Sequence, residues 1–355
     1  MPADSRAGRV VVAYAGGGHP HVFSRIRLMA ERPDVEVAGI YDPEPERAAG
    51  IARRTGVAVL ETLDALAERR PDIVISEALD HEMPAIGEGL AGRVPLILLE
   101  KPGGPDLPAV RRMLERLEAA GTEVELGYQL HYTPGLDRVL DILRTGALGQ
   151  VTLARFHAST PIGCSMELWQ SLPEDLGGLM FTEGCHMLEL ILTTLGTPAS
   201  ASGSIRRLPA GASVATTRYK RDLFSAGGET TTLQVGTGVH EDVAVATLNY
   251  ADLVAVLDLT GWEADDWVSR WTMEYYGTLG TLQVFLSPPS IRLHLERAGG
   301  GHEAGVTCWA PDPRAQATPY EAQLDRLVRR ARGEKTGDGV TAGLGLDVVR
   351  VLDAI

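Results

Sequence analysis

The sequence predicts an α/β protein in two parts: an N-terminal domain with a parallel sheet and a C-terminal α+β domain with an open, mostly antiparallel sheet. Short apolar segments alternate with helical segments over about the first 125 residues, which is typical of βαβ units. The second half instead has alternating segments joined by tight turns. The length of 355 residues also suggests two domains.

Each element of the N-terminal part follows from its local pattern. The expected strands are apolar and rich in β-branched residues, and they are 9–13, 35–41, 72–76, 96–99 and 124–127. The expected helices between them are 22–31, 45–55, 83–91 and 107–120. Because parallel strands are buried on both faces, apolarity without alternation indicates a parallel sheet.

The C-terminal part has a different pattern. A helix is expected at 134–145, and strands are expected at 151–158, 243–249, 254–260, 271–276, 281–286 and 291–296. Helices at 320–332 and 343–355 end the chain. One face of such a sheet needs cover, either from helices or from another subunit. We therefore expect one domain at 1–128 and another at 129–355.

Composition and charge exclude several classes of function. The net charge of −14 argues against nucleic-acid binding, because phosphate contacts need a basic surface. No apolar run approaches the roughly 18 residues of a membrane helix, and the polar first nine residues do not resemble a secretory signal. The odd number of cysteines, Cys164, Cys185 and Cys308, predicts reduced thiols and a cytoplasmic location.

A glycine-rich turn, AYAGGGHPH at residues 13–21, follows the first expected strand. In a dinucleotide site such a turn brings backbone N–H groups to the pyrophosphate at a helix N-terminus. Against the pattern G-x-G-x-x-G, Ala13 and Ala15 replace the first two glycines, and Gly18 matches the third. The alternative is a turn that binds no ligand.

An acidic residue, Asp42, follows the second expected strand. At this place a carboxylate accepts hydrogen bonds from ribose hydroxyls, which favours NAD over NADP. The alternative is that Asp42 caps the helix that starts near Pro45.

The segment Glu100-Lys101-Pro102 directly follows the fourth strand, and with other motifs in order along nearly the whole chain it resembles the Gfo/Idh/MocA family of oxidoreductases. The other motifs are the turn ending at His21, Tyr41-Asp42-Pro43, Gly127-Tyr128, Trp169 followed by Gly177-Gly178, Gly184-Cys185-His186, the turn at Gly277 to Gly280, and Gly337-Asp338-Gly339.

The resemblance implies hydride transfer between NAD(P), with NAD slightly preferred, and a carbinol or carbonyl carbon of a sugar, cyclitol or related polar metabolite. It implies a dinucleotide-binding Rossmann domain at 1–128. The domain at 129–355 would bind the substrate and form a homodimer or homotetramer through its sheet.

The resemblance also implies roles for single residues. Lys101 would lie near the reacting oxygen, where an ammonium stabilises alkoxide charge, and His186 would exchange a proton with that oxygen, with Thr182 beside it. Cofactor contacts are expected from Ala15, Gly16, Gly17, Gly18, His21, Asp42, Glu77, His81, Glu100 and Lys101. Substrate contacts are expected from Tyr128, His131, Trp169 and Glu183.

Departures from the family pattern keep alternatives open. Thr182 stands where the family usually has Asp, and Glu77 lies where it usually has Thr-Pro and then Asn. A non-redox lyase, cyclase or isomerase, or a silent ligand-binding protein, on the same scaffold would fit these changes. Lys101 would then be an ordinary loop residue and His186 a core residue. His186 shares helical spacing with Glu183 and Glu189, but no partner pair is evident, so no metal site is expected.

Overall fold

A computed structural model describes residues 8–19, 21–161, 178–206, 212–219, 228–235, 241, 243–263, 271–312, 314, 317–337 and 339–355. The chain divides into two compact units. The first unit holds the described residues up to Tyr128 together with Tyr320–Leu346. The second unit holds the described residues from Gln129 to Pro319 together with Asp347–Ile355.

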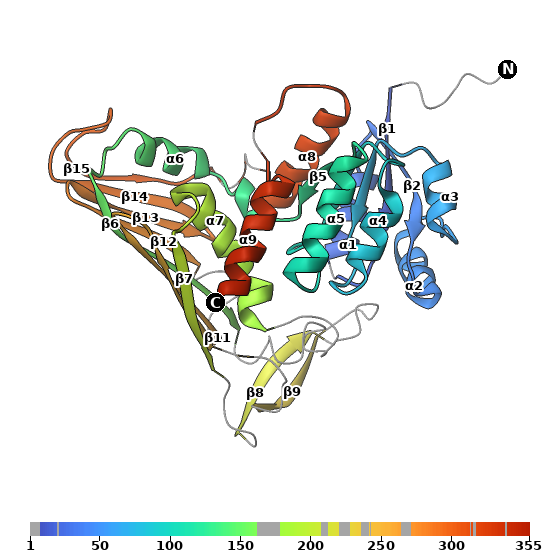
Figure 1. Cartoon of the computed structure of the whole chain (residues 1–355), viewed down its shortest axis with the longest axis horizontal. Coiled ribbons are helices and arrows are strands. Elements are labelled where there is room, and N and C mark those ends of the chain that lie inside the picture. The colour runs from blue at the N-terminus through green and yellow to red at the C-terminus, as the bar shows by residue number, and fades with distance from the viewer. Residues whose placement is uncertain are drawn as a thin grey trace. The chain divides into compact units, whose positions relative to one another are not determined.

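The first unit is built on a five-stranded parallel sheet (Figure 1). Its strands are β1 (Val10–Ala15), β2 (Val35–Tyr41), β3 (Ile73–Ser76), β4 (Leu96–Leu99) and β5 (Glu123–Leu126), in the order β2-β1-β3-β4-β5. Every residue of β1, β3 and β4 is buried, which is why these segments are apolar without alternation. The predicted parallel sheet is confirmed.

Helices connect the strands of the first unit. They are α1 (His21–Ala30), α2 (Pro45–Thr55), α3 (Leu63–Glu68), α4 (Met83–Leu90) and α5 (Leu107–Ala119). Helix α1 places Val22, Ile26 and Met29 in the core of the sheet. Helices α4 and α5 pack against each other, with Gly87 facing Met113 (Figure 1).

Helix α8 (Pro319–Ala331) lies with the first unit although it comes from the far end of the chain. Its apolar side chains Leu324, Leu327 and Val328 join the core cluster that contains β1 and α1. An amphipathic helix is stabilised where its apolar face is covered, and this core supplies the cover. The expected boundary at residue 128 placed residues 320–346 in the C-terminal domain, whereas the structure groups them with the N-terminal unit.

The second unit contains an eight-stranded sheet, in the order β15-β14-β13-β12-β6-β11-β10-β7. Its strands are β6 (Val151–Pro161), β7 (Ser200–Arg206), β10 (Val243–Asn249), β11 (Val254–Glu263), β12 (Thr272–Gly277), β13 (Gly280–Leu286), β14 (Pro289–Leu295) and β15 (Gly305–Trp309). Only the pairing of β6 with β11 is parallel among these neighbours. The predicted open, mostly antiparallel sheet is confirmed.

Helical segments cover one face of this sheet (Figure 1). They include η1 (Gln129–Tyr132), α6 (Leu136–Arg144), the π-helical turn η4 (Met180–Gly184) and α7 (Cys185–Leu195). Helix α9 (Ala342–Ala354) begins in the first unit and ends in the second. Strand β8 (Ala212–Tyr219) pairs with β9 (Gly228–Val235) as a separate hairpin.

Side chains alternate along the strands of the sheet, as the pleat requires. In β10 the buried residues Ala244 and Ala246 flank Val245, which is 41% exposed. Val254 and Phe285 are also exposed and lie on the same face as Val245. The sheet therefore keeps an apolar surface that the described helices leave open.

Candidate active site

The glycine turn between β1 and α1 is tightly packed against the protein itself. Gly16 has φ 83°, a conformation that favours glycine, and a Cβ there would approach the backbone of Ala78 to 2.8 Å. A Cβ on Gly18 would meet the side chain of Leu79 at 2.4 Å. Ala15 ends the strand and is fully buried. The glycines thus permit close packing of the loop after β3.

The backbone N–H groups of this turn have acceptors within the protein. Gly16 N–H donates to the Tyr41 carbonyl oxygen at 2.7 Å, and His19 N–H donates to the Glu77 carbonyl oxygen at 2.8 Å. Gly17 N–H donates to Asp42 Oδ2 at 2.7 Å. These are groups that would face a pyrophosphate in a dinucleotide site.

Asp42, the expected ribose acid, has a fully covered side chain that is already bonded on both oxygens. Besides Gly17, it accepts from the Glu44 N–H at 2.8 Å and from Arg47 Nε at 2.9 Å. Arg47 also binds Glu82 at 2.7 Å. Burial lowers the pKa of Arg47, but Asp42 and Glu82 raise it more, so the guanidinium stays charged. Asp42 is not the N-cap of α2, which is Glu44.

The turn has the position of a dinucleotide-binding turn, but its polar groups do not fit a dinucleotide as they stand. The ribose acid and the turn amide bind each other, and Arg47 takes the remaining capacity of the carboxylate. A pyrophosphate and a ribose would bind there only in exchange for these bonds. We therefore derive no chemical step through a dinucleotide.

A second group of side chains gathers where β1, β3 and β4 end, and we call it the His–Glu cluster: His19, His21, Glu77 and Glu100. His19 lies 3.7 Å from each glutamate, through Nδ1 to Glu77 Oε2 and through Nε2 to Glu100 Oε1. His21 Nδ1 lies 3.4 Å from Glu100 Oε2, and its Nε2 contacts the Tyr320 hydroxyl at 2.5 Å. Arg25 pairs with both glutamates and is fully buried.

Burial and charge shift the pKa values of the cluster in different directions. Burial raises the pKa of Glu77 well above its usual value. Burial would also raise the pKa of Glu100, but the neighbouring His19, His21 and Arg25 hold it well below its usual value. Burial lowers the pKa of both histidines, although Glu100 opposes this shift.

Lys101, the expected catalytic lysine, follows β4 and is 6% exposed. Its charge lowers the pKa of Glu77 and of both cluster histidines, so it lies in their electrostatic neighbourhood. The structure thus gathers the expected residues His21, Glu77, Glu100 and Lys101. His81 lies on the same unit but is exposed.

The expected catalytic residues His186 and Thr182 belong to the second unit, on α7 and η4. His186 is 3% exposed, and its ring centroid lies 6.0 Å from that of Trp271. The Thr182 hydroxyl donates to the Gly178 carbonyl oxygen at 2.8 Å. Glu183 is 6% exposed. Thr182 thus closes a helical turn, and its hydroxyl proton serves the backbone.

His131, an expected substrate contact, binds a buried acid. Its Nδ1 lies 2.7 Å from Oε1 of Glu189, which is fully buried and also accepts from the Thr193 hydroxyl at 2.6 Å. Tyr128 is fully buried in the first unit. Trp169 lies outside the described residues. Sequence reasoning missed the pairing with Glu189 because residues 131 and 189 lie on separate elements.

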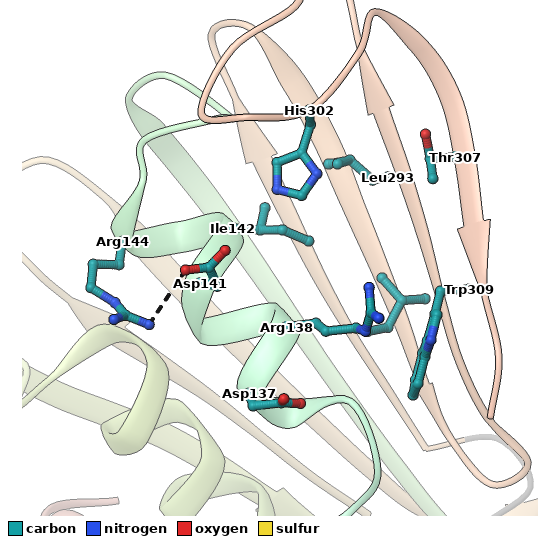
Figure 2. Close-up of a pocket in the computed structure, with 10 residues that line it drawn as sticks. Asp137, Arg138, Asp141, Ile142, Arg144, Leu293, His302, Thr307 and Trp309 are labelled. Atoms are coloured by element: carbon teal, nitrogen blue, oxygen red, sulfur yellow. Dashed lines mark ion pairs between the residues drawn. The ribbon is translucent and has the colours of Figure 1, made fainter.

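A cavity of about 400 Å³ lies elsewhere in the second unit, between α6 and the strands β14 and β15 (Figure 2). Arg138 lies over the Trp309 ring, 4.9 Å from its centroid, and Asp141 pairs with Arg144. A smaller cavity of about 220 Å³ surrounds His157 and Asp258. None of the predicted site residues lines either of these two cavities.

No helix in the described part of the chain combines the length and apolarity that crossing a bilayer requires.

Comparison with known proteins places the fold in a class. Residues 10–128 match the description "Oxidoreductase family, NAD-binding Rossmann fold", and residues 136–283 match the C-terminal domain that accompanies it. The fold and both matched regions thus define a two-domain oxidoreductase-family protein. The chain belongs to the Gfo/Idh/MocA family.

Individual relatives are distant. An inositol 2-dehydrogenase of Rubrobacter xylanophilus is 28% identical over 166 residues, which are 46% of this chain and 47% of that protein. The chain therefore matches about half the length of this curated relative. A levoglucosan dehydrogenase solved with NADH and levoglucosan has a TM-score of 0.75 at 15% identity, covering 98% of this chain and 96% of that one.

The WlbA dehydrogenase of Bordetella pertussis, solved with NADH and UDP-GlcNAcA, has a TM-score of 0.72 at 16% identity. The match covers 98% of this chain and 95% of that one. At such identities the likeness of these structures establishes the shared fold.

Proposed function

We propose that this chain is an NAD(P)-dependent oxidoreductase, with NAD preferred, that acts on a carbinol or carbonyl carbon of a sugar, cyclitol or related polar metabolite. The single observation that carries the proposal is that both regions of the chain match one oxidoreductase family, over residues 10–128 and 136–283. The substrate class is supported by the activities of the relatives, which include an inositol and a levoglucosan dehydrogenase.

Two side chains are proposed to move charge and protons at the substrate. The Lys101 ammonium would stabilise negative charge on the reacting oxygen, and its burial at 6% exposure strengthens such an interaction. His186 would exchange a proton with that oxygen. Thr182 would orient the turn rather than carry a proton, since its hydroxyl serves the Gly178 carbonyl.

The test is a titration of the purified protein with NADH and with NADPH, followed by a screen of inositols and sugars for reduction of NAD or NADP. We expect Lys101→Ala and His186→Ala to lower turnover at least 100-fold. Lys335→Ala, at an exposed lysine, is the matched control and should keep full activity. Failure of both dinucleotides to bind at millimolar concentration would contradict the proposal.

A second candidate is a non-redox enzyme on the same scaffold, such as a lyase, cyclase or isomerase. The observation that favours it is the bonding of Asp42 to Gly17 and Arg47, which occupies groups that a dinucleotide would need. It predicts turnover of a polyol or keto sugar with no change in the absorbance of added NADH. Reversible hydride transfer to any such compound would dismiss this candidate.

We also propose that the chain forms a homodimer or homotetramer through the sheet of the second unit. Val245, Val254 and Phe285 lie on the same face and are 37–41% exposed there, and burial of such side chains favours association. Light scattering coupled to gel filtration tests this, with Val245→Asp expected to give monomers.

A reducing, cytoplasmic compartment is proposed as well, since neither Cys185 nor Cys308 forms a disulfide within the described residues.

A further inference from the structure

We propose that the His–Glu cluster of the first unit is a binding site for a divalent transition-metal ion, with Zn²⁺ as the best match. The site consists of His19, His21, Glu77 and Glu100. It goes beyond the proposed oxidoreductase function and does not depend on it.

The four side chains come from three separate segments of the chain and converge at one place. One potential ligand atom from each residue lies within 4.8 Å of the others. His19 lies in the turn after β1, His21 begins α1, Glu77 follows β3, and Glu100 follows β4. Neighbouring parallel strands bring their carboxyl ends to one edge of the sheet, and that edge is where the cluster forms.

The spacing within the cluster suits a shared ion better than direct hydrogen bonds. His19 faces the two glutamates through different nitrogens, Nδ1 toward Glu77 Oε2 and Nε2 toward Glu100 Oε1, each at 3.7 Å, so one ion would take only one of these nitrogens. His21 Nδ1 lies 3.4 Å from Glu100 Oε2. Hydrogen bonds between such groups are normally about 2.7–3.2 Å long. Two ligand atoms of a tetrahedral Zn²⁺, each roughly 2.0–2.2 Å from the ion, are about 3.3–3.6 Å apart.

Buried carboxylate oxygens point the same way. Glu77 and Glu100 are 0% and 1% exposed. Glu77 Oε2 and Glu100 Oε1, the two oxygens that face His19, have no hydrogen-bond partner among the described residues. A buried carboxylate oxygen without a partner is costly, and coordination of a cation is one of the few ways to satisfy it.

Arg25 leaves these two oxygens available. Its guanidinium binds Glu77 through Oε1 and Glu100 through Oε2, which are the opposite oxygens of the two carboxylates. Arg25 would thus hold the two carboxylates in place without contacting the ion, as partners of metal ligands commonly do. Because Arg25 and Lys101 already balance the two carboxylates, we expect the ion to be held more weakly than in sites without such cations, and to be removable with a chelator.

The donor set points to the class of ion. Two imidazole nitrogens and two carboxylate oxygens suit Zn²⁺ and its first-row neighbours, whereas Mg²⁺ and Ca²⁺ prefer oxygen ligands alone. A residue set of this kind also explains why histidine and glutamate stand at the edge of a sheet whose interior is otherwise apolar.

The experiment uses the full chain without added dinucleotide. Protein treated with chelator and then dialysed is titrated with Zn²⁺ by calorimetry, and with Co²⁺ by visible absorption, which reports tetrahedral coordination. We expect one ion per chain, and at least a tenfold loss of affinity in Glu77→Gln and in His21→Ala. The second variant removes the most exposed ligand and is the safer one for folding. Circular dichroism checks that each variant is folded.

The matched control is His157→Ala, which removes a histidine paired with Asp258 in the other unit. It should bind Zn²⁺ as the unchanged protein does. Absence of stoichiometric binding in the unchanged protein would overturn the proposal, and so would equal affinity in the folded cluster variants. Because the readouts are metal binding and Co²⁺ absorption, they are independent of whether the chain oxidises a substrate.

Discussion

Replacement of Arg47 by methionine separates the two expected roles of Asp42, as the partner of a buried guanidinium and as an acceptor for a ribose. Arg47 forms ion pairs with both Asp42 and Glu82, at 2.7 Å from each carboxylate. Methionine retains much of the length of the side chain but donates no hydrogen bond. The Asp42 carboxylate would keep the N–H groups of Gly17 and Glu44 as donors and lose its cation.

The expected effect on stability follows from burial. The side chains of Arg47 and Asp42 are 8% and 0% exposed, so little solvent is present to replace the lost partner. Removing one member of a buried ion pair destabilises a protein by about 3–5 kcal/mol. Urea unfolding should therefore show a loss in this range. Arg53→Met, at an exposed position of the same helix, is the control and should change stability by less than about 0.5 kcal/mol.

The same variant should raise the affinity for NADH. A hydrogen bond to a charged group contributes about 1.5–3 kcal/mol, and a dinucleotide ribose competes with Arg47 for Asp42. Releasing one such bond corresponds to roughly 10–100-fold tighter binding, at about 1.4 kcal/mol per tenfold. Fluorescence titration measures it. A folded Arg47→Met protein whose NADH affinity equals that of the unchanged chain would refute the idea that Arg47 competes with the ribose for Asp42.

Three further predictions concern stability. Gly16→Ala should destabilise the protein by more than about 2 kcal/mol, because a positive φ and the Ala78 backbone both oppose a Cβ. The control Gly56→Ala has a positive φ but open space, so it should cost only about 1 kcal/mol. Urea unfolding measures both changes. Leu327→Ala on α8 should lower the free energy of unfolding by about 2–5 kcal/mol. A change as small as that at an exposed position would contradict the packing of α8 on the first unit. Burial lowers the pKa of His19 in the folded state below its unfolded value near 6.5. The contribution of His19 to folding stability is therefore present above that pH and is lost as the pH falls. In the metal-free protein, the free energy of unfolding should fall less steeply with decreasing pH in His19→Gln than in the unchanged chain, by up to about 1.4 kcal/mol per pH unit. An unchanged slope would count against this role of His19.

The architecture was largely predictable because it follows from local patterns. Continuous apolar runs predicted β1, β3 and β4, and alternation predicted strands such as β10. The position of α8 was not predictable, since an amphipathic helix shows that it has an apolar face but does not show which core covers it.

The single residues of the candidate site were recognised without their relations to one another. Asp42 was predicted as a ribose acid, and the structure adds its bonds to Gly17 and Arg47, which depend on the approach of β2 and α2 to the turn. Trp169 stays a prediction, because it lies outside the described residues. The roles of Lys101 and His186 also stay predictions.

From its order of motifs alone, the sequence determined the family and the two-domain α/β class, because periodicity and short motifs are properties of neighbouring residues. The convergence of His19, His21, Glu77 and Glu100 was decided only by the tertiary structure. His19 and His21 are two residues apart, but Glu77 and Glu100 come from other segments, and only the pairing of parallel strands brings all four side chains to one edge.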